Sequence, residues 1–315
     1  MQKNYSIIIP HKNIPDLLQR CLASIPRRGD VQIIVVDDNS DPDKVDFEHF
    51  PGLGDSFVEV VFTKEGKGAG YARNVGLTKV TGKWLLFADA DDYFVDGFLQ
   101  CLDKYKESEY DLVYFDIIGI YGDTKWESDR GRKYNKLLKE AICGQKHDEC
   151  KYKWAVVWGK MYKHSLIRDN NITFDETMIG EDRMFSFKTA YYARKISFDE
   201  NKIYTSETRQ GSLVTLRRTL DLNFDRFFVL VRTNAFLRDI KQKNFKRNLI
   251  IPLFRLINTK NMAFFIMGIE LIKENDINLG IEIFEFCKVL PNKIFRKIGR
   301  YLRYNKNKLM LLVSY

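Results

Sequence analysis

The segment Trp84-Leu85-Leu86-Phe87-Ala88-Asp89-Ala90-Asp91-Asp92 carries the strongest structural signal of the chain. Its apolar first half predicts a buried strand, and three carboxylates follow directly. Carboxylates this close repel one another unless a cation or a polar ligand neutralises them. Alternate residues of an extended segment point to the same side, so Asp89 and Asp91 could hold a hard divalent ion. The alternative is a solvated acidic turn in which Asp92 caps the next helix.

Strand and helix signals alternate on both sides of this segment. Strands are predicted at 6–9, 32–36, 57–62 and 112–118, and helices at 17–25, 70–80 and 94–105. This alternation predicts an α/β fold whose mainly parallel sheet has helices on both faces. Ligands of such sheets bind beyond the carboxyl ends of strands, where both the acidic cluster and Asp37-Asp38-Asn39-Ser40 lie. A turn whose side chains bond their own backbone is the alternative for 37–40.

The rest of the chain is organised differently. Residues 119–150 are polar and predict an insertion or a mobile loop, and the chain from about 220 predicts helices only. We expect an α/β domain at 1–215 and a helical C-terminal region at 216–315. The cluster of Cys143, His147 and Cys150 offers three irregularly spaced ligands, which is a weak case for zinc.

The net charge of +9 comes almost entirely from the end of the chain. Eight basic residues and no acidic residue follow Glu285, so residues 1–285 carry only +1. Basic and apolar residues alternate over 288–308, which predicts an amphipathic helix suited to an anionic membrane surface. A terminal helix packed on the domain is the alternative. Scattered cysteines, no long apolar run and no signal-peptide core predict a cytoplasmic protein. The basic tail would make it peripheral on the inner face of the cytoplasmic membrane.

Two further motifs are ambiguous by themselves. The loop Gly66-Lys67-Gly68-Ala69-Gly70 fails the Walker pattern, because Val61 stands where a glycine is needed. It also fails the dinucleotide fingerprint at Arg73, which leaves a flexible loop before a helix whose arginine could reach a phosphate or a base. The pair Glu181-Asp182 precedes a helical pattern, where a carboxylate is commonly only a cap.

The motifs together resemble one family. They are Ser-Ile-Ile-Ile-Pro-His-Lys-Asn at 6–13, Val-Val-Asp-Asp-Asn-Ser at 35–40, Ala-Arg-Asn-Val-Gly at 72–76, Phe-Ala-Asp-Ala-Asp-Asp-Tyr at 87–93, Trp-Gly-Lys at 158–160 and Gly-Glu-Asp-Arg-Met-Phe at 180–185. This ordered set resembles the family 2 glycosyltransferases, which have the GT-A fold, over residues 5 to about 215.

The resemblance implies a role for each matched residue. Asp38 would bind the uracil N3–H of a UDP-sugar, and Arg73 would touch the nucleotide. Asp89 and Asp91 would be the DxD pair, with Asp91 the direct metal ligand and Asp89 nearer the ribose. Asp182 would be the general base, with Glu181 next in line. The remaining implied residues are Pro10, His11, Asn13 and Ala90 at the donor nucleotide and Trp158 and Lys160 at the acceptor.

The implied reaction is the inverting transfer of a sugar to a hydroxyl of a glycan or lipid-linked glycan, as in bacterial surface polysaccharide synthesis. A divalent metal ion, Mn²⁺ or Mg²⁺, would stabilise the leaving diphosphate. A carboxylate across the sugar would take the proton of the attacking hydroxyl. The chain departs from the pattern at Glu207, where many relatives have the first arginine of Tyr-Arg-x-Arg-x-x-Ser, although Arg209 and Ser212 fit.

Two alternatives remain. A sugar-1-phosphate nucleotidyltransferase shares a related sheet but needs a glycine-rich, arginine-bearing loop where Pro10-His11-Lys12-Asn13 stands. A non-catalytic protein that binds nucleic acid through the basic tail would leave both acidic motifs without a purpose. We therefore expect no nucleic-acid partner.

Overall fold

The computed structural model describes residues 3–209, 219–257 and 262–289. The chain divides into two compact units, Met1–Asp225 and Arg226–Tyr315. The domain boundary predicted at 215 falls within 210–218, outside the described residues.

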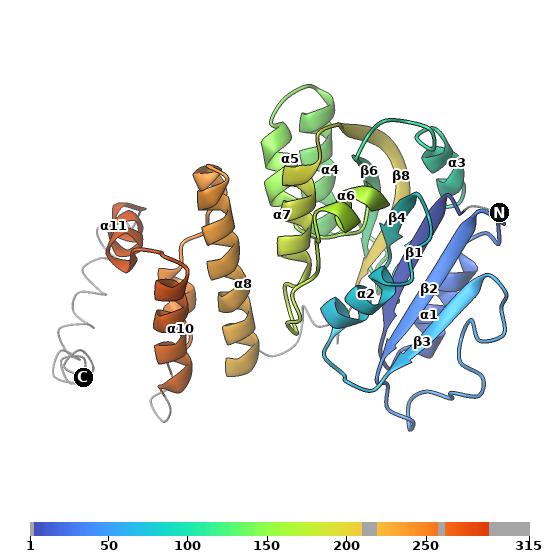
Figure 1. Ribbon diagram of the computed structural model, residues 1–315, viewed down its shortest axis with the longest axis horizontal. Helices are drawn as coiled ribbons and strands as arrows, with labels where there is room; N and C mark the ends of the chain where they lie inside the picture. Colours follow the sequence, from blue (N-terminus) through green and yellow to red (C-terminus); the bar gives the residue numbers. More distant parts are fainter. Residues whose placement is uncertain (1–2, 210–218, 258–261, 290–315) are drawn as a thin grey trace. The chain divides into compact units, whose positions relative to one another are not determined.

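An eight-stranded sheet forms the first unit (Figure 1). In spatial order its strands are β3 (Val58–Thr63), β2 (Val31–Asp38), β1 (Tyr5–His11), β4 (Trp84–Phe87), β7 (Lys160–Lys163), β6 (Leu112–Tyr121), β8 (Ile196–Thr208) and β5 (Tyr93–Phe94). The first four strands run parallel, as do β6 and β8, whereas β7 and β5 are antiparallel to their neighbours. The predicted mainly parallel sheet is confirmed.

The central strands are covered on both faces. Every residue of β1 and β4 is buried, including successive side chains that point to opposite sides of the sheet. This explains why these strands are continuous apolar runs without alternation. The connecting helices are α1 (Pro15–Ala23), α2 (Ala69–Leu77), α3 (Phe98–Asp103), α6 (His164–Asp169) and α7 (Asp182–Tyr192).

The segment 119–150 is not the irregular insertion that its polarity predicts. It completes β6 and then forms α4 (Asp129–Ile142) and α5 (His147–Lys153). The Ser128 side chain caps α4, and an apolar stripe at helical spacing is buried beneath it, formed by Tyr134, Leu137, Leu138 and Ala141. A Cβ on Gly131 would lie 2.8 Å from Gly119 Cα in β6, so only glycine permits this close packing. The prediction was wrong because charged residues separate the apolar positions.

The chain from Leu220 is helical, as predicted, over the ranges that the structure covers. Its elements are α8 (Leu220–Asp239), a 3-10 turn η1 (Lys243–Phe245), α9 (Ile250–Phe254), α10 (Ala263–Glu274) and α11 (Leu279–Val289). Within the described ranges, no helix combines the length and apolarity needed to cross a bilayer. The predicted amphipathic tail lies outside the described residues from position 290 onward.

Candidate active site

Three carboxylates gather just beyond the end of β4. Ligand oxygens of Asp89, Asp91 and Asp92 lie within 4.8 Å of one another, and no other group of three His, Cys, Asp or Glu side chains in the described ranges is so placed. Tyr204 in β8 donates to Asp92 Oδ2 at 2.9 Å, and the Glu207 N–H donates to Asp92 Oδ1 at 2.8 Å. Asp92 is buried, and burial beside the other two carboxylates raises its pKa well above the ordinary value. Asp92 therefore anchors the loop.

The other two carboxylates are better placed for a ligand. The Asp89 and Asp91 side chains are 27% and 23% exposed, so their oxygens can reach a bound group. Burial, together with the Asp89 charge, raises the pKa of Asp91. Carboxylate oxygens are preferred ligands of Mg²⁺ and similar hard ions. A divalent cation would also supply the positive charge that such a cluster needs, so the donor set fits the predicted metal.

Arg73 connects this cluster to the predicted base. Its guanidinium is buried, with NH2 2.6 Å from Asp89 and NH1 3.0 Å from both Glu181 and Asp182. The three carboxylates raise the pKa of Arg73 against the effect of burial. Gly70 makes this arrangement possible, because a Cβ there would approach a backbone oxygen of the segment before α7 to 2.1 Å. Arg73 thus shares one ion-pair network with Asp89, 16 positions later in the chain, and with Glu181 and Asp182, 108 and 109 positions later.

Asp182 is the first residue of α7 and has an unusual titration. Burial raises its pKa to about 7, with the Glu181 and Asp89 charges adding to the rise and Arg73 opposing it. A carboxyl group that titrates near neutral pH is matched to accepting a proton from a hydroxyl. The geometry therefore brings the candidate base and the candidate metal ligands together around one arginine.

Asp38 lies at the end of β2 with one oxygen unused. Its Oδ2 accepts from the Gly68 N–H at 2.8 Å and lies 3.3 Å from Lys12 Nζ. Its Oδ1 is buried and has no hydrogen-bond partner among the described residues. Because a buried acceptor without a partner is costly, this oxygen suits a ligand N–H. Asn13 contacts the segment that follows Asp38, with its Oδ1 accepting from the Asp41 N–H at 2.7 Å.

Three other residues predicted at the donor are buried: Pro10, His11 and Ala90. The Nε2 of His11 accepts from the Ile14 N–H at 3.1 Å, and its ring meets the Phe50 ring edge-on with centroids 5.1 Å apart. In this structure His11 supports the turn between β1 and α1. A nucleotide contact from these residues stays a prediction.

The two residues predicted at the acceptor are also buried. Trp158 stacks on Tyr204 with ring centroids 5.7 Å apart. Lys160 Nζ donates to the Trp154 carbonyl at 2.9 Å, and burial lowers the pKa of Lys160 to about 7. Both side chains are buried in this structure, so a direct acceptor contact remains a prediction.

Comparisons with known proteins agree with this arrangement. Residues 6–161 match the model of the glycosyl transferase family 2. The chain belongs to glycosyltransferase family 2. EpsJ of Bacillus subtilis (strain 168), described as an uncharacterized glycosyltransferase, is 28% identical over 224 residues, covering 67% of this chain and 63% of EpsJ. A poly(ribitol-phosphate) beta-glucosyltransferase of Bacillus spizizenii is 29% identical over 206 residues, covering 63% of this chain and 31% of that protein.

A solved structure confirms the GT-A fold of this family 2 glycosyltransferase. S. aureus TarS (residues 1–349) in complex with UDP-GlcNAc superposes with a TM-score of 0.59 and 20% identity, covering 84% of this chain and 79% of that one. The ordered motifs therefore predicted the family and the fold correctly.

Residues that the motifs did not predict also lie at the candidate site. Arg130, in the first turn of α4, lies 4.7 Å from the centroid of the Trp158 ring. Tyr134 and the acids Asp89, Asp92 and Asp182 raise the pKa of Arg130 against the effect of burial, so its charge faces the acidic cluster. No sequence signal could identify Arg130 while its helix was taken for a loop.

Glu207 forms a second ion-pair network beside the cluster. Its carboxylate is 2.9 Å from both Arg20 NH1 and Lys125 Nζ and is nearly buried. Arg20 also donates to the backbone carbonyl of Asp91. Arg209 Nε lies 3.1 Å from Asp91 Oδ2, while Ser212 lies outside the described residues. The departure at Glu207 thus places an acidic side chain that holds two basic side chains, Arg20 and Lys125, beside the loop that carries Asp91.

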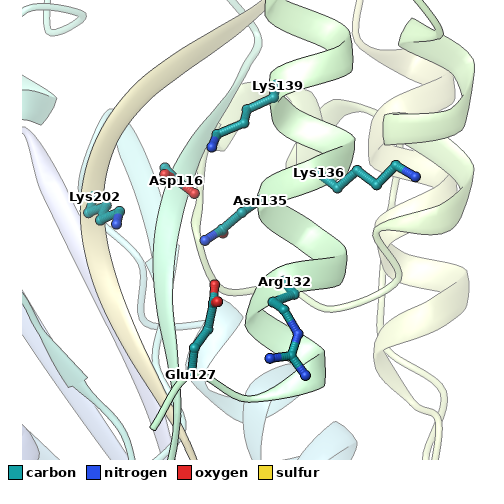
Figure 2. Close-up of a pocket in the computed structure, with 7 residues that line it drawn as sticks. All are labelled: Asp116, Glu127, Arg132, Asn135, Lys136, Lys139 and Lys202. Carbon is teal, nitrogen blue, oxygen red and sulfur yellow. The ribbon is translucent and has the colours of Figure 1, made fainter.

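A separate polar cavity of about 400 Å³ lies between α4, β6 and β8 (Figure 2). Its lining residues are Asp116, Glu127, Arg132, Asn135, Lys136, Lys139 and Lys202. None of them was predicted to bind the donor, the metal or the acceptor. The cluster around Asp89, and not this cavity, is therefore the candidate site of the reaction.

Proposed function

We propose that this chain transfers a sugar from a UDP-sugar, with inversion at the anomeric carbon, to a hydroxyl of a glycan or lipid-linked glycan. One observation carries the proposal: Arg73 links Asp89 of the DxD pair to Asp182, whose side chain is 16% exposed and whose pKa is raised to about 7. This places a candidate metal site and a candidate base at one site, as a single displacement requires.

The donor is proposed to bind between β2 and the DxD loop. Asp38 Oδ1 is the acceptor for the uracil N3–H, since this buried oxygen at the end of β2 has no hydrogen-bond partner among the described residues. Pro10, His11, Asn13 and Ala90 are proposed to line or support the same pocket, with Arg73 at the nucleotide. A related fold holding UDP-GlcNAc supports a UDP-sugar.

The metal is proposed to be Mn²⁺ or Mg²⁺. Asp91 would hold it directly, with Asp89 nearer the ribose, because these carboxylates are partly exposed and Asp92 is engaged by Tyr204 and Glu207. When bound, the ion supplies positive charge to the leaving diphosphate. Arg209, on Asp91, and Arg130, facing the cluster, add fixed positive charge from the chain itself.

Asp182 is proposed to take the proton of the attacking acceptor hydroxyl. One base and one displacement give inversion, whereas retention would need a second chemical step. Glu181 is the reserve candidate, since it shares Arg73 NH1 at the same 3.0 Å. Trp158 and Lys160 are proposed on the acceptor side as supporting residues.

The acceptor is proposed to be a bacterial surface polysaccharide or its lipid-linked precursor. The similarity to a poly(ribitol-phosphate) beta-glucosyltransferase supports a polymer acceptor. The basic sequence at 288–308 supports a peripheral position on the anionic inner face of the cytoplasmic membrane. No nucleic-acid partner is proposed, because such a partner would leave both acidic motifs without a purpose.

UDP release across a panel of nucleotide sugars tests the proposal and identifies the donor. Asp182→Asn should still bind UDP but lose transfer by a factor of about 10² to 10⁴, the contribution of a general base. NMR of the product should show an inverted anomeric centre. Retention, or full turnover by Asp182→Asn, would contradict the mechanism. Pyrophosphate release from UTP and a sugar 1-phosphate would instead favour the nucleotidyltransferase.

A further inference from the structure

The second unit exposes an unusual number of large apolar side chains. Of the described residues after Asp225, eight are large, apolar and exposed, against nine in the much longer first unit. The eight are Ile251, Phe254, Ile257, Ile266, Met267, Ile281, Ile283 and Phe284. Exposed apolar groups at this density are typical of an interaction surface.

Helix α11 shows the pattern most clearly, because its polarity is reversed. Glu282 is 3% exposed and pairs with Lys246 Nζ at 3.1 Å, while Ile281 and Phe284 are 54% and 60% exposed. A helix packed on a core in water normally presents the opposite arrangement. The outer face of α11 is therefore suited to an apolar environment.

A lysine side chain, that of Lys288, lies on the same face of α11. Ile281, Phe284 and Lys288 are spaced i, i+3 and i+7, so they share one side of the helix. The Lys288 Nζ lies 4.3 Å from the centroid of the Phe284 ring. An aromatic ring beside a long basic side chain suits the boundary between lipid headgroups and acyl chains, where the ammonium reaches the phosphates.

The net charge of the C-terminal part of the sequence indicates that the partner is negatively charged. Residues 226–315 contain 18 lysines and arginines and 6 acidic residues, a net charge of +12, whereas residues 1–225 carry −3. All charged residues after Glu285 are basic. An apolar face that leads into such a sequence matches an anionic lipid surface, since basic residues near that surface are attracted to its charge.

We propose that the outer face of α11, formed by Ile281, Phe284 and Lys288, binds an anionic bilayer surface. The two apolar side chains insert at the headgroup boundary, and Lys288 pairs with lipid phosphate. The proposal shares only the membrane location with the proposed function and is independent of the sugar-transfer chemistry. It adds a folded helix face to the contact expected from the tail alone.

Vesicle flotation of the full chain tests this surface. Wild type should bind vesicles of phosphatidylcholine containing phosphatidylglycerol and should bind pure phosphatidylcholine far less. The double variant Ile281→Ser, Phe284→Ser should partition at least about tenfold more weakly, because both side chains lose their apolar insertion. Leu53→Ser is the matched control, since Leu53 is 51% exposed on the first unit, and it should bind as wild type.

Two further variants separate the contact from a folding defect. Phe284→Trp should retain binding, because tryptophan also favours the interface. Lys288→Glu should weaken binding to the anionic vesicles by fivefold or more. UDP binding should stay unchanged in every variant, so that loss of the membrane contact is distinguished from failure of the proposed enzyme.

The results that would overturn the proposal are equally direct. If the double variant bound vesicles as strongly as wild type, the membrane contact would belong to the tail alone. If wild type bound equally to both vesicle types, the partner would not be an anionic lipid surface. A dimer seen by light scattering without vesicles, and lost in the double variant, would assign the face to a second copy of the chain.

Discussion

The Arg73 network gives the sharpest stability prediction. Arg73→Met keeps much of the side-chain volume but leaves Asp89, Glu181 and Asp182 without their shared cation. Removing one partner of a buried ion pair costs about 3–5 kcal/mol. For a unit of this size, about 2–4 °C is lost per kcal/mol, so Tm should fall by roughly 6–20 °C. Thermal unfolding followed by circular dichroism at pH 8 measures this change.

The pH dependence of the loss follows from the same charges. Arg73 opposes the burial that raises the pKa of Asp182 to about 7, so the variant should have a still higher pKa there. A buried carboxyl whose folded pKa exceeds its unfolded value destabilises the protein when it is ionised. The Asp182 contribution to the loss in Arg73→Met should therefore be larger at pH 8 than at pH 7, and it should disappear as the pH falls through 7, because Asp182 is then protonated in both proteins.

Arg28 provides the matched control. It also pairs with two carboxylates, Asp30 at 2.6 Å and Asp103 at 2.7 Å, but its side chain is 33% exposed. Arg28→Met should cost at most about 1 kcal/mol, because solvent screens exposed pairs. Equal losses in the two variants, or a loss in Arg73→Met that does not change with pH, would refute the assignment of Arg73 as the central cation.

Two other predictions concern the base and the metal loop. Because the Glu181 charge contributes to the raised pKa of Asp182, Glu181→Gln should shift the ascending limb of the kcat/KM profile to lower pH; an unshifted limb would contradict Asp182 as the base. Glu207→Gln should loosen Arg20 from the Asp91 carbonyl and weaken Mn²⁺ binding measured by EPR several-fold. Lys125→Gln, which changes an exposed side chain, should have little effect, and equal weakening by both would refute this role.

The parallel half of the sheet could be predicted because strands that are buried on both faces have a recognisable sequence pattern. β1 and β4 are covered on both faces, so their residues form continuous apolar runs. β7 and β5 have no such run. Lys160–Lys163 and Tyr93–Phe94 become strands through pairings with β4 and β8, such as Leu85 with Tyr162 and Phe94 with Tyr204. The helix predicted at 94–105 accordingly starts later, at Phe98.

The candidate site could be predicted only where motifs carry it. The DxD pair, Asp38 and Asp182 stood out because each follows a strand or precedes a helix in a known order. Burial of Trp158 could not be predicted, since it packs against Tyr134 and Arg130 of α4, whose charged residues hid its apolar stripe. Arg130 and Tyr204 reach the acidic cluster from helices and strands distant in sequence, so tertiary contact alone identifies them.

UDP binding measured by calorimetry with and without Mn²⁺ tests the central claim most directly. The account predicts that Mn²⁺ strengthens UDP binding to wild type and that Asp91→Asn abolishes this dependence. Asp96→Asn, at an exposed carboxylate nearby, should behave as wild type. If Asp91→Asn kept the full Mn²⁺ dependence, the acidic cluster would not be the metal site and the proposed mechanism would be wrong.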